Sequence, residues 1–248
     1  MFIPKTDRIK KLAEKYPERI KELEEIFDKK TNIYIDFANV IRWQDKFKWH
    51  IDLKRLKQFL DSFSNIEKIK FYNGKLERDE KSLAILEEAE KCGYIVKTKL
   101  VKIMRLSIDV SSIPPNSPEI LKSFIRAPLL KKLKVEAIEF LNSQLKELNQ
   151  QGILFIQDLK CNFDVEIGRD MLLDYEKNRV ENFILWSGDS DFAGPVSQLL
   201  EDGKRVVLFA TARRVASELN ELQEKGLFIF DIQKIKDFIC WKREISSV

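Results

Sequence analysis

Short apolar segments rich in β-forming residues alternate with helical stretches along most of the chain, and this alternation limits the fold more than any other feature. Three such segments precede residue 101 and three follow residue 180: NIYIDFANV, KIKFYNG, YIVKTKL, ENFILW, KRVVLFA and GLFIFDI. Helical patterns lie between them, at residues 53–63, 80–91, 196–201 and 212–222. Strands that alternate with helices form βαβ units around a parallel sheet. We therefore expect an α/β fold with a mainly parallel central sheet.

Two stretches depart from this alternation. Residues 1–31 predict an N-terminal helical extension, in which Pro17 separates two short helices. The following domain, residues 32–240, is interrupted by a helical insertion at about 102–151, and residues 241–248 form a C-terminal tail. The segment from Lys97 to Lys134 has nine basic and two acidic residues, a net charge of +7 against +4 for the whole chain. Because phosphates attract such charge, the insertion favours a nucleic-acid partner.

The few histidines and cysteines exclude several classes of enzyme. His50 is the only histidine, and the three cysteines form no CxxC pair. Metalloproteases with an HExxH motif, iron sites with two histidines and zinc deaminases are therefore excluded. The sequence also lacks the apolar stretch of a signal peptide or a membrane span, so we expect a cytoplasmic protein with no membrane partner.

Aspartates follow three predicted strands, at the end of a parallel sheet where ligands bind. The polar residues at these ends are Asp36 with Asn39, Asp164 with Asp170, and Asp189 with Asp191. The strand before Asp164 is expected to include ILFIQ. A single aspartate of this kind is often only a helix cap. Several carboxylates brought together repel one another unless a cation balances them, and oxygen ligands suit Mg²⁺ or Mn²⁺. The sequence therefore predicts a divalent metal site.

Three segments, in chain order, resemble the NYN domain, here its LabA-like branch within the PIN-like ribonuclease superfamily. They are YIDFANV, KCNFDVEIGRDML and SGDSDFAGPVSQLLEDGKRVVLF. The resemblance extends over residues 32–239, apart from the insertion. It implies a PIN-like three-layer α/β/α fold. It also implies a metal-dependent ribonuclease that hydrolyses RNA phosphodiester bonds through a cluster of aspartates.

The resemblance also implies a role for each matching residue. Asp36, Asp164 and Asp189 would bind the metal, and Asp191 would be a fourth acid that binds directly or through water. Asn39 would orient Asp36 or a metal-bound water, and Lys160 would contact a phosphate. Asp170 is expected to support the ligands from behind, because six residues along a helix need not return to the same face.

Further substrate contacts are expected beside this site. In the tract RWQDKFKWH, residues 42–50, Arg42 and two lysines could meet phosphates while Trp43, Phe47 and Trp49 stack on unpaired bases. The alternative is that these aromatic residues pack in the core or at a dimer surface. Ser187 and Ser190, within SGDSDF, complete the predicted substrate contacts.

Other functions remain open alternatives at this point. A phosphatase of the haloacid-dehalogenase type needs a second aspartate two residues after the first, where this chain has Ala38. A catalytically silent or partner-activated RNA-binding module would keep the same fold. A second copy or another protein could then bind through the N-terminal helices or the insertion. The leading hypothesis is an endonuclease that acts on single-stranded or structured RNA.

Overall fold

The chain forms two compact units in the computed structural model, which describes residues 1–47, 49–77, 79–211 and 215–241, and the side chains of these except at 45–47. The first, here called the core unit, combines residues 1–100 with those from Asn162 onward. The second, here called the insertion unit, is Val101–Cys161. No helix among the described residues is long and apolar enough to cross a membrane.

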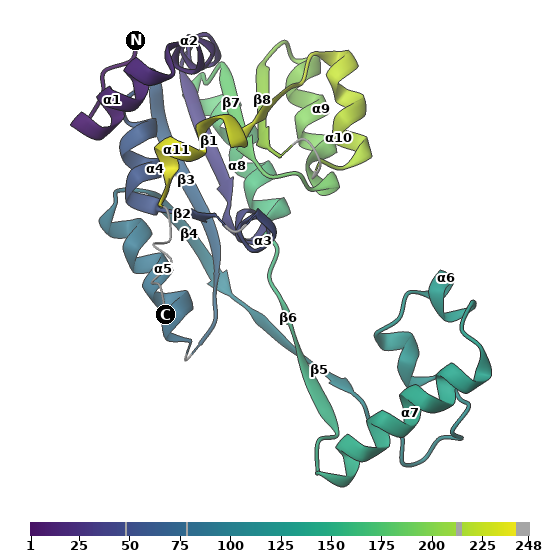
Figure 1. Cartoon of the computed structure of the whole chain (residues 1–248). Helices are drawn as coiled ribbons and strands as arrows, with labels where there is room; N and C mark the ends of the chain where they lie inside the picture. Colours follow the sequence, from purple (N-terminus) through teal and green to yellow (C-terminus); the bar gives the residue numbers. More distant parts are fainter. Residues whose placement is uncertain (48, 78, 212–214, 242–248) are drawn as a thin grey trace. The chain divides into compact units, whose positions relative to one another are not determined.

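A six-stranded sheet forms the centre of the core unit (Figure 1). Its strands are β1 (Thr31–Asp36), β3 (Ile66–Lys75), β4 (Ile95–Leu100), β7 (Asn182–Trp186), β8 (Arg205–Ala210) and β9 (Phe228–Asp231). They are all parallel, in the order β4-β3-β1-β7-β8-β9. Both β1 and β7 are buried along their whole length, as expected for parallel strands covered on both faces. The predicted α/β class is confirmed.

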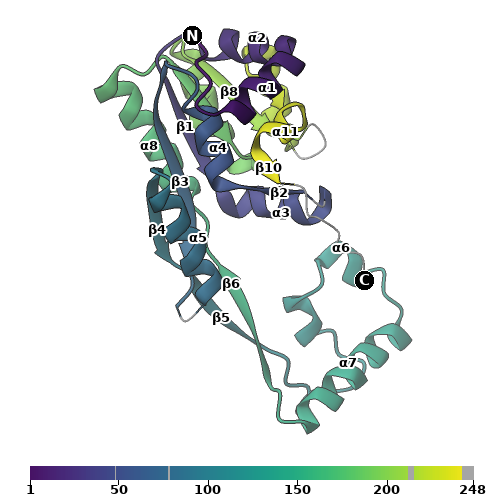
Figure 2. The same cartoon turned by 60° about the vertical axis from the view of Figure 1, so that its left-hand side comes forward.

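Helices cover both faces of this sheet and complete three layers (Figures 1 and 2). The helices α8 (Asp164–Asn178) and α9 (Ala193–Glu201) lie on one face, and α4 (Leu53–Leu60) and α11 (Lys236–Ile239) lie on the other. The remaining helices of the unit include α3 (Phe37–Phe47), α5 (Glu80–Lys91) and α10 (Ser217–Glu221). A short antiparallel pair joins β2 (His50–Ile51) to β10 (Cys240–Trp241). Of the predicted tail, residues 242–248 lie outside the described part of the chain.

The N-terminal extension belongs to the core unit. It forms α1 (Asp7–Lys15) and α2 (Pro17–Ile26), which are separated at Pro17 as predicted, since proline is tolerated in the first turn of a helix. Ile9 and Leu23 are fully buried. The Arg8 guanidinium donates hydrogen bonds to the backbone carbonyls of residues 237 and 238 at 3.2 and 2.7 Å. The extension is therefore packed onto the C-terminal part of the core unit.

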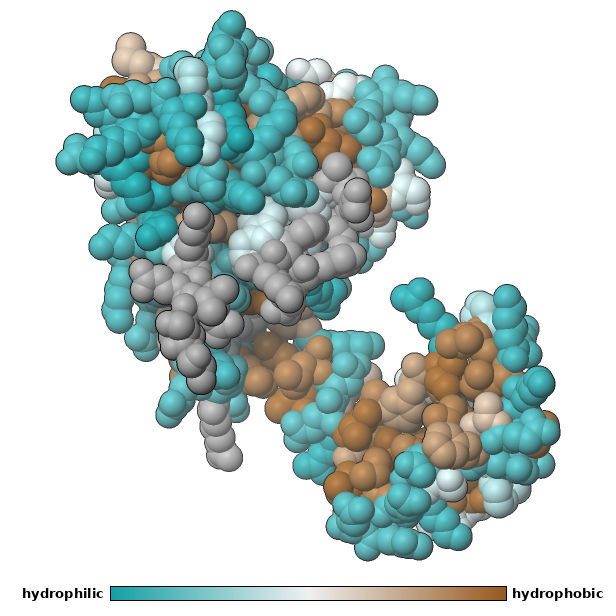
Figure 3. Space-filling view, in the orientation of Figure 1, coloured by the Kyte–Doolittle hydropathy of each residue, from teal (hydrophilic) through white to brown (hydrophobic). Residues whose placement is uncertain are grey.

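The insertion unit consists of a two-stranded ribbon and a group of helices. The ribbon pairs β5 (Lys102–Ser107) antiparallel with β6 (Phe155–Lys160), and the helices are the short α6 (Ala127–Leu130), α7 (Val135–Gln150) and a 3-10 turn at Ile120–Ser123. ILFIQ was expected to lie in the central sheet, but β6 pairs with β5 instead, so this prediction is wrong and the unit extends past residue 151 to Cys161. Apolar residues gather on the face of the unit seen in Figure 3, and Phe140 is 62% exposed.

Candidate active site

Asp36 occupies the carboxyl end of the central strand β1. It is 7% exposed, and α3 begins at the next residue. The backbone N–H of Asn39, in the first turn of α3, donates to Asp36 Oδ1 at 3.4 Å. Burial raises the pKa of Asp36 above its ordinary value, and the hydrogen bonds from Asn39 and Ser187 offset part of that rise. The strand end thus presents a carboxylate that is partly desolvated and held in place.

Ser187, directly after β7, links the first aspartate to the motif that follows β7. Its hydroxyl donates to Asp36 Oδ2 at 3.2 Å and accepts from Asn39 Nδ2 at 3.1 Å and from the backbone N–H of Asp189 at 3.4 Å. Ser187 is fully buried, so the prediction that it contacts substrate is wrong. It orients Asp36 and the start of the loop at Asp189 instead. Asn39 contacts both Asp36, through its backbone N–H, and Ser187, through its side chain, so it is placed to orient the Asp36 carboxylate.

Asp189 and Asp191 occupy the turn between β7 and α9. Asp189 precedes a 3-10 turn, Ser190–Phe192, and its Oδ1 accepts from the backbone N–H of Asp191 at 3.3 Å. Asp189 therefore caps this 3-10 turn, which is the structural role expected of a single aspartate at such a position. Asp191 is exposed and Asp189 is half-buried, so both carboxylates remain accessible to a ligand.

Asp164 begins α8, and its carboxyl group lies near enough to the other three aspartates to interact with their charges. Asn162 Nδ2 donates to Asp164 Oδ2 at 2.7 Å. Burial raises the pKa of Asp164, and the charges of Asp189, Asp191 and Asp36 add to the rise together with a hydrogen bond to Asp191, which brings the pKa to about 6. The structure therefore brings together the four aspartates that the sequence singled out, at the carboxyl ends of β1 and β7. We call Asp36, Asp164, Asp189 and Asp191 the acidic cluster.

The acidic cluster suits a hard divalent cation in the kind and charge of its donors. All four side chains offer carboxylate oxygens, and their mutual repulsion is what a cation would relieve. No group of three histidine, cysteine, aspartate or glutamate side chains among the described residues is already arranged to hold a metal ion. The donors therefore fit Mg²⁺ or Mn²⁺ chemically, but their side chains are not arranged to coordinate one ion together.

Asp170 belongs to a second group of polar residues, between α8 and the sheet. It is 7% exposed, accepts a hydrogen bond from Tyr72 Oη at 2.9 Å and lies 3.6 Å from Lys70 Nζ. Asp170 therefore faces the strand β3. Sequence reasoning missed Lys70 and Tyr72 here, although two polar groups at alternate positions of a strand expected to be buried were a usable signal.

The other residues predicted to contact substrate lie partly in the core, partly on the surface of the core unit and partly in the insertion unit. Trp43 is 4% exposed and lines a small apolar pocket with Val40, so its predicted stacking on a base is wrong and the core-packing alternative holds. Arg42 is exposed and Ser190 is half-buried. Lys160 lies on β6, in the insertion unit. Lys48 and the side chains at 46 and 47 lie outside the described residues.

Comparison with known proteins finds a family model that matches part of the chain and a solved structure with a similar fold. The model of the NYN domain matches residues 121–230, a range that contains Asp164, Asp189 and Asp191. A solved structure of a protein of unknown function from Vibrio parahaemolyticus matches 86% of this chain and 96% of its own, with 16% sequence identity and a TM-score of 0.51. At that identity the likeness concerns the fold alone. No curated protein matches the chain.

Proposed function

We propose that the chain, whose residues 121–230 match the model of the NYN domain, a domain of the PIN-like ribonuclease superfamily, is a metal-dependent ribonuclease of the LabA-like branch. It would hydrolyse RNA phosphodiester bonds in the cytoplasm as an endonuclease, with Mg²⁺ or Mn²⁺ as cofactor. One observation carries the proposal: burial, and next to it the charges of three neighbouring carboxylates, raise the pKa of Asp164 to about 6. Carboxylates crowded at the end of a parallel sheet are a functional arrangement, since they cost stability unless a cation binds.

Each residue of the site has a specific task under this proposal. Asp36, Asp164 and Asp189 would hold the metal, with Asp191 binding directly or through water. Bound there, the ion would supply an activated water and charge stabilisation for the leaving oxygen of the phosphodiester. Ser187 and Asn39 fix the rotamer of Asp36 through the hydrogen bonds described above.

Basic side chains are proposed to bind the RNA backbone. Arg42 is exposed on α3, which begins directly after Asp36, and Lys160 lies on β6 of the insertion unit. Ser190, between Asp189 and Asp191, is half-buried and offers a hydroxyl beside the acidic cluster. Phosphate contacts of this kind strengthen binding to any sequence and weaken as salt rises.

Cleavage of a labelled single-stranded RNA tests the proposal. The purified chain is assayed with Mn²⁺, with Mg²⁺ and with EDTA, beside the variants Asp189→Asn and Asp202→Asn. Asparagine can still cap the turn at residue 189, so the first variant removes a charge with little effect on the fold. Asp202 is an exposed aspartate at the end of α9 and serves as the matched control. We expect metal-dependent cleavage that Asp189→Asn abolishes and Asp202→Asn retains, and cleavage of a circular RNA would identify an endonuclease.

A catalytically silent or partner-activated RNA-binding module is the second candidate. It is favoured by one observation, that no three acidic side chains among the described residues are arranged to hold a metal. Its partner would be a second copy or another protein bound through the N-terminal helices or the insertion unit, whose Leu129 and Phe140 are 57% and 62% exposed. RNA retention that weakens with salt, without cleavage, would select this candidate over the ribonuclease.

A further inference from the structure

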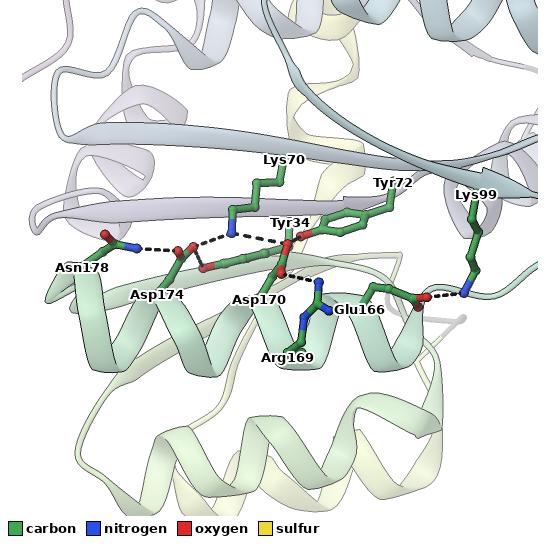
Figure 4. Close-up of polar contacts among 9 residues, drawn as sticks. All are labelled: Tyr34, Lys70, Tyr72, Lys99, Glu166, Arg169, Asp170, Asp174 and Asn178. Carbon is green, nitrogen blue, oxygen red and sulfur yellow. Dashed lines mark hydrogen bonds and ion pairs between the residues drawn. The ribbon is translucent and has the colours of Figure 1, made fainter.

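A group of charged and hydroxyl side chains is buried between α8 and the sheet (Figure 4). Lys70 Nζ lies 2.9 Å from Asp174 Oδ2 and 3.6 Å from Asp170 Oδ2, and the three side chains are 9%, 5% and 9% exposed. Asp174 also accepts hydrogen bonds from Asn32 Nδ2 at 2.7 Å and Tyr34 Oη at 2.6 Å. Tyr72 donates to Asp170. We call these six residues the buried polar network: Asn32, Tyr34, Lys70, Tyr72, Asp170 and Asp174.

Ionised carboxylates are costly to bury unless they are paired, and this network pairs them. Burial alone would raise the pKa of Asp174, but the hydrogen bonds from Tyr34 and Lys70 outweigh it and hold the pKa below its ordinary value. One ammonium serves two carboxylates that are four residues apart on one face of α8. The network therefore depends on where α8 lies along the sheet, because a shift of the helix would carry Asp170 and Asp174 away from Lys70 on β3.

The network continues directly into the acidic cluster. Successive side chains of a strand alternate between its two faces, so Asn32, Tyr34 and Asp36 share the face that α8 covers. Tyr34 is paired in register with Lys70, and Asp36 with Tyr72. The aspartates of α8 that interact with Tyr34, Tyr72 and Asp36 are Asp174, Asp170 and Asp164, in that order. Their numbers fall as those of β1 rise, so α8 and β1 run in opposite directions.

The segment of α8 from Asp164 to Asp174 and the segment of β1 from Asn32 to Asp36 are also similar in length. Ten residues of helix, from Asp164 to Asp174, span about 15 Å, and four residues of strand, from Asn32 to Asp36, span about 13 Å. A helix anchored at Asp174 therefore carries Asp164 to the level of Asp36. Apolar packing alone is not directional and would leave this register loosely specified.

From this geometry we propose that Lys70 is a positioning residue of the acidic site, which sets the register of α8 through Asp170 and Asp174 and thereby places Asp164 beside Asp36. This proposal rests on the proposed function in one respect, because the quantity that it controls is metal binding at the acidic cluster. It assigns no chemistry to Lys70 itself. Its specific consequence is that removing the network weakens the metal site from a distance of ten residues along the helix.

The test compares two charge-removing variants of the full chain. Lys70→Met alone removes the ammonium shared by two buried carboxylates and can unfold the chain, although Asp170 keeps Arg169 of its own helix at 3.3 Å and Asp174 keeps its hydrogen bonds. The main variant is therefore the triple change Lys70→Met, Asp170→Asn and Asp174→Asn. Replacing a whole buried ion group is tolerated far better than removing one member. The matched control is Lys30→Met, which removes a partly exposed lysine that lies just before the start of β1, 3.1 Å from Glu67. Thermal unfolding first establishes that each variant is folded.

Mn²⁺ binding is then measured by electron paramagnetic resonance, well below the melting temperature of every variant, so that lost stability alone does not change the result. We expect the folded triple variant to bind Mn²⁺ at least tenfold more weakly than the wild type, and Lys30→Met to stay within twofold. Wild-type affinity in the folded triple variant would overturn the proposal.

Hydrogen exchange of the amides at 164–168 separates the failure of this proposal from the failure of the proposed function. Should the wild type bind no Mn²⁺, the metal site itself is refuted and exchange decides the positioning role. Exchange at 164–168 that is at least tenfold faster in the triple variant, with that of β7 unchanged, supports the role. Exchange as slow as in the wild type overturns it.

Discussion

Replacing Asp164 with asparagine should stabilise the metal-free protein at neutral pH. The pKa of Asp164 rises from 3.8 to about 6 on folding, because of burial and then the charges of Asp189, Asp191 and Asp36. The folded state therefore binds the proton more tightly than the unfolded chain, and the free energy of unfolding falls as pH rises between about 4 and 6. Above that range the ionised Asp164 is a cost that Asp164→Asn removes.

The size of this effect follows from the shift. Two pKa units correspond to about 3 kcal/mol for a fully buried group. Asp164 is only half-buried, so solvent screening reduces this to about 1 kcal/mol. The helix N-terminus favours its charge by a further few tenths of a kcal/mol, which lowers the net gain slightly. For a chain of this length, we expect a rise in melting temperature of about 2–4 °C at pH 7 in EDTA.

Calorimetry at two pH values and two metal conditions measures the effect. At pH 4.5 the wild-type carboxyl is largely protonated, so the difference between wild type and Asp164→Asn should shrink. In Mn²⁺ the order should reverse, because a ligand that binds the native state stabilises it. Asp202→Asn, on the surface, should change the melting temperature by less than 1 °C under every condition, a bound set by the small effects of surface substitutions. A lower melting temperature for Asp164→Asn than for the wild type at pH 7 in EDTA would refute the reasoning.

Four other substitutions test the surroundings of the site. A Cβ at Gly168 would lie 3.0 Å from Pro195 Cγ, so Gly168→Ala should lower the free energy of unfolding in urea by about 1 kcal/mol, and a gain instead would contradict this close contact of α8 and α9. Ser187→Ala removes a buried donor to the first-strand carboxylate, and we expect a loss of about 1–2 kcal/mol with a higher Mn²⁺ requirement for cleavage; an unchanged Mn²⁺ requirement would argue against an orienting role. Trp43→Ala should lower the free energy of unfolding by about 3 kcal/mol. Arg42→Ala should change it by no more than about 0.5 kcal/mol but weaken RNA binding in fluorescence anisotropy. The reverse pattern would indicate that Trp43, and not Arg42, contacts RNA.

The sequence by itself determined the central architecture and much of the acidic cluster. Strand and helix periodicity are local properties, so the parallel sheet could be predicted without contacts. Asp36, Asp189 and Asp191 could be placed at strand ends for the same reason, since Asp36 is the last residue of its strand and the other two follow theirs within a few residues. The convergence of these ends then follows from the parallel direction of the strands.

Pairing and burial were decided only by the tertiary structure. ILFIQ has the pattern of a strand, but the pattern does not specify its partner, and β6 pairs with β5 in the insertion unit. Trp43 could face either solvent or the core, and in the fold it is buried beside a small pocket that it lines together with a residue far along the chain, Ile232. The pair of Lys70 and Asp174 joins positions about a hundred residues apart, because a folded backbone brings the faces of β3 and α8 together. A local pattern specifies what an element is, whereas the partner of a buried charge depends on which other element packs against it.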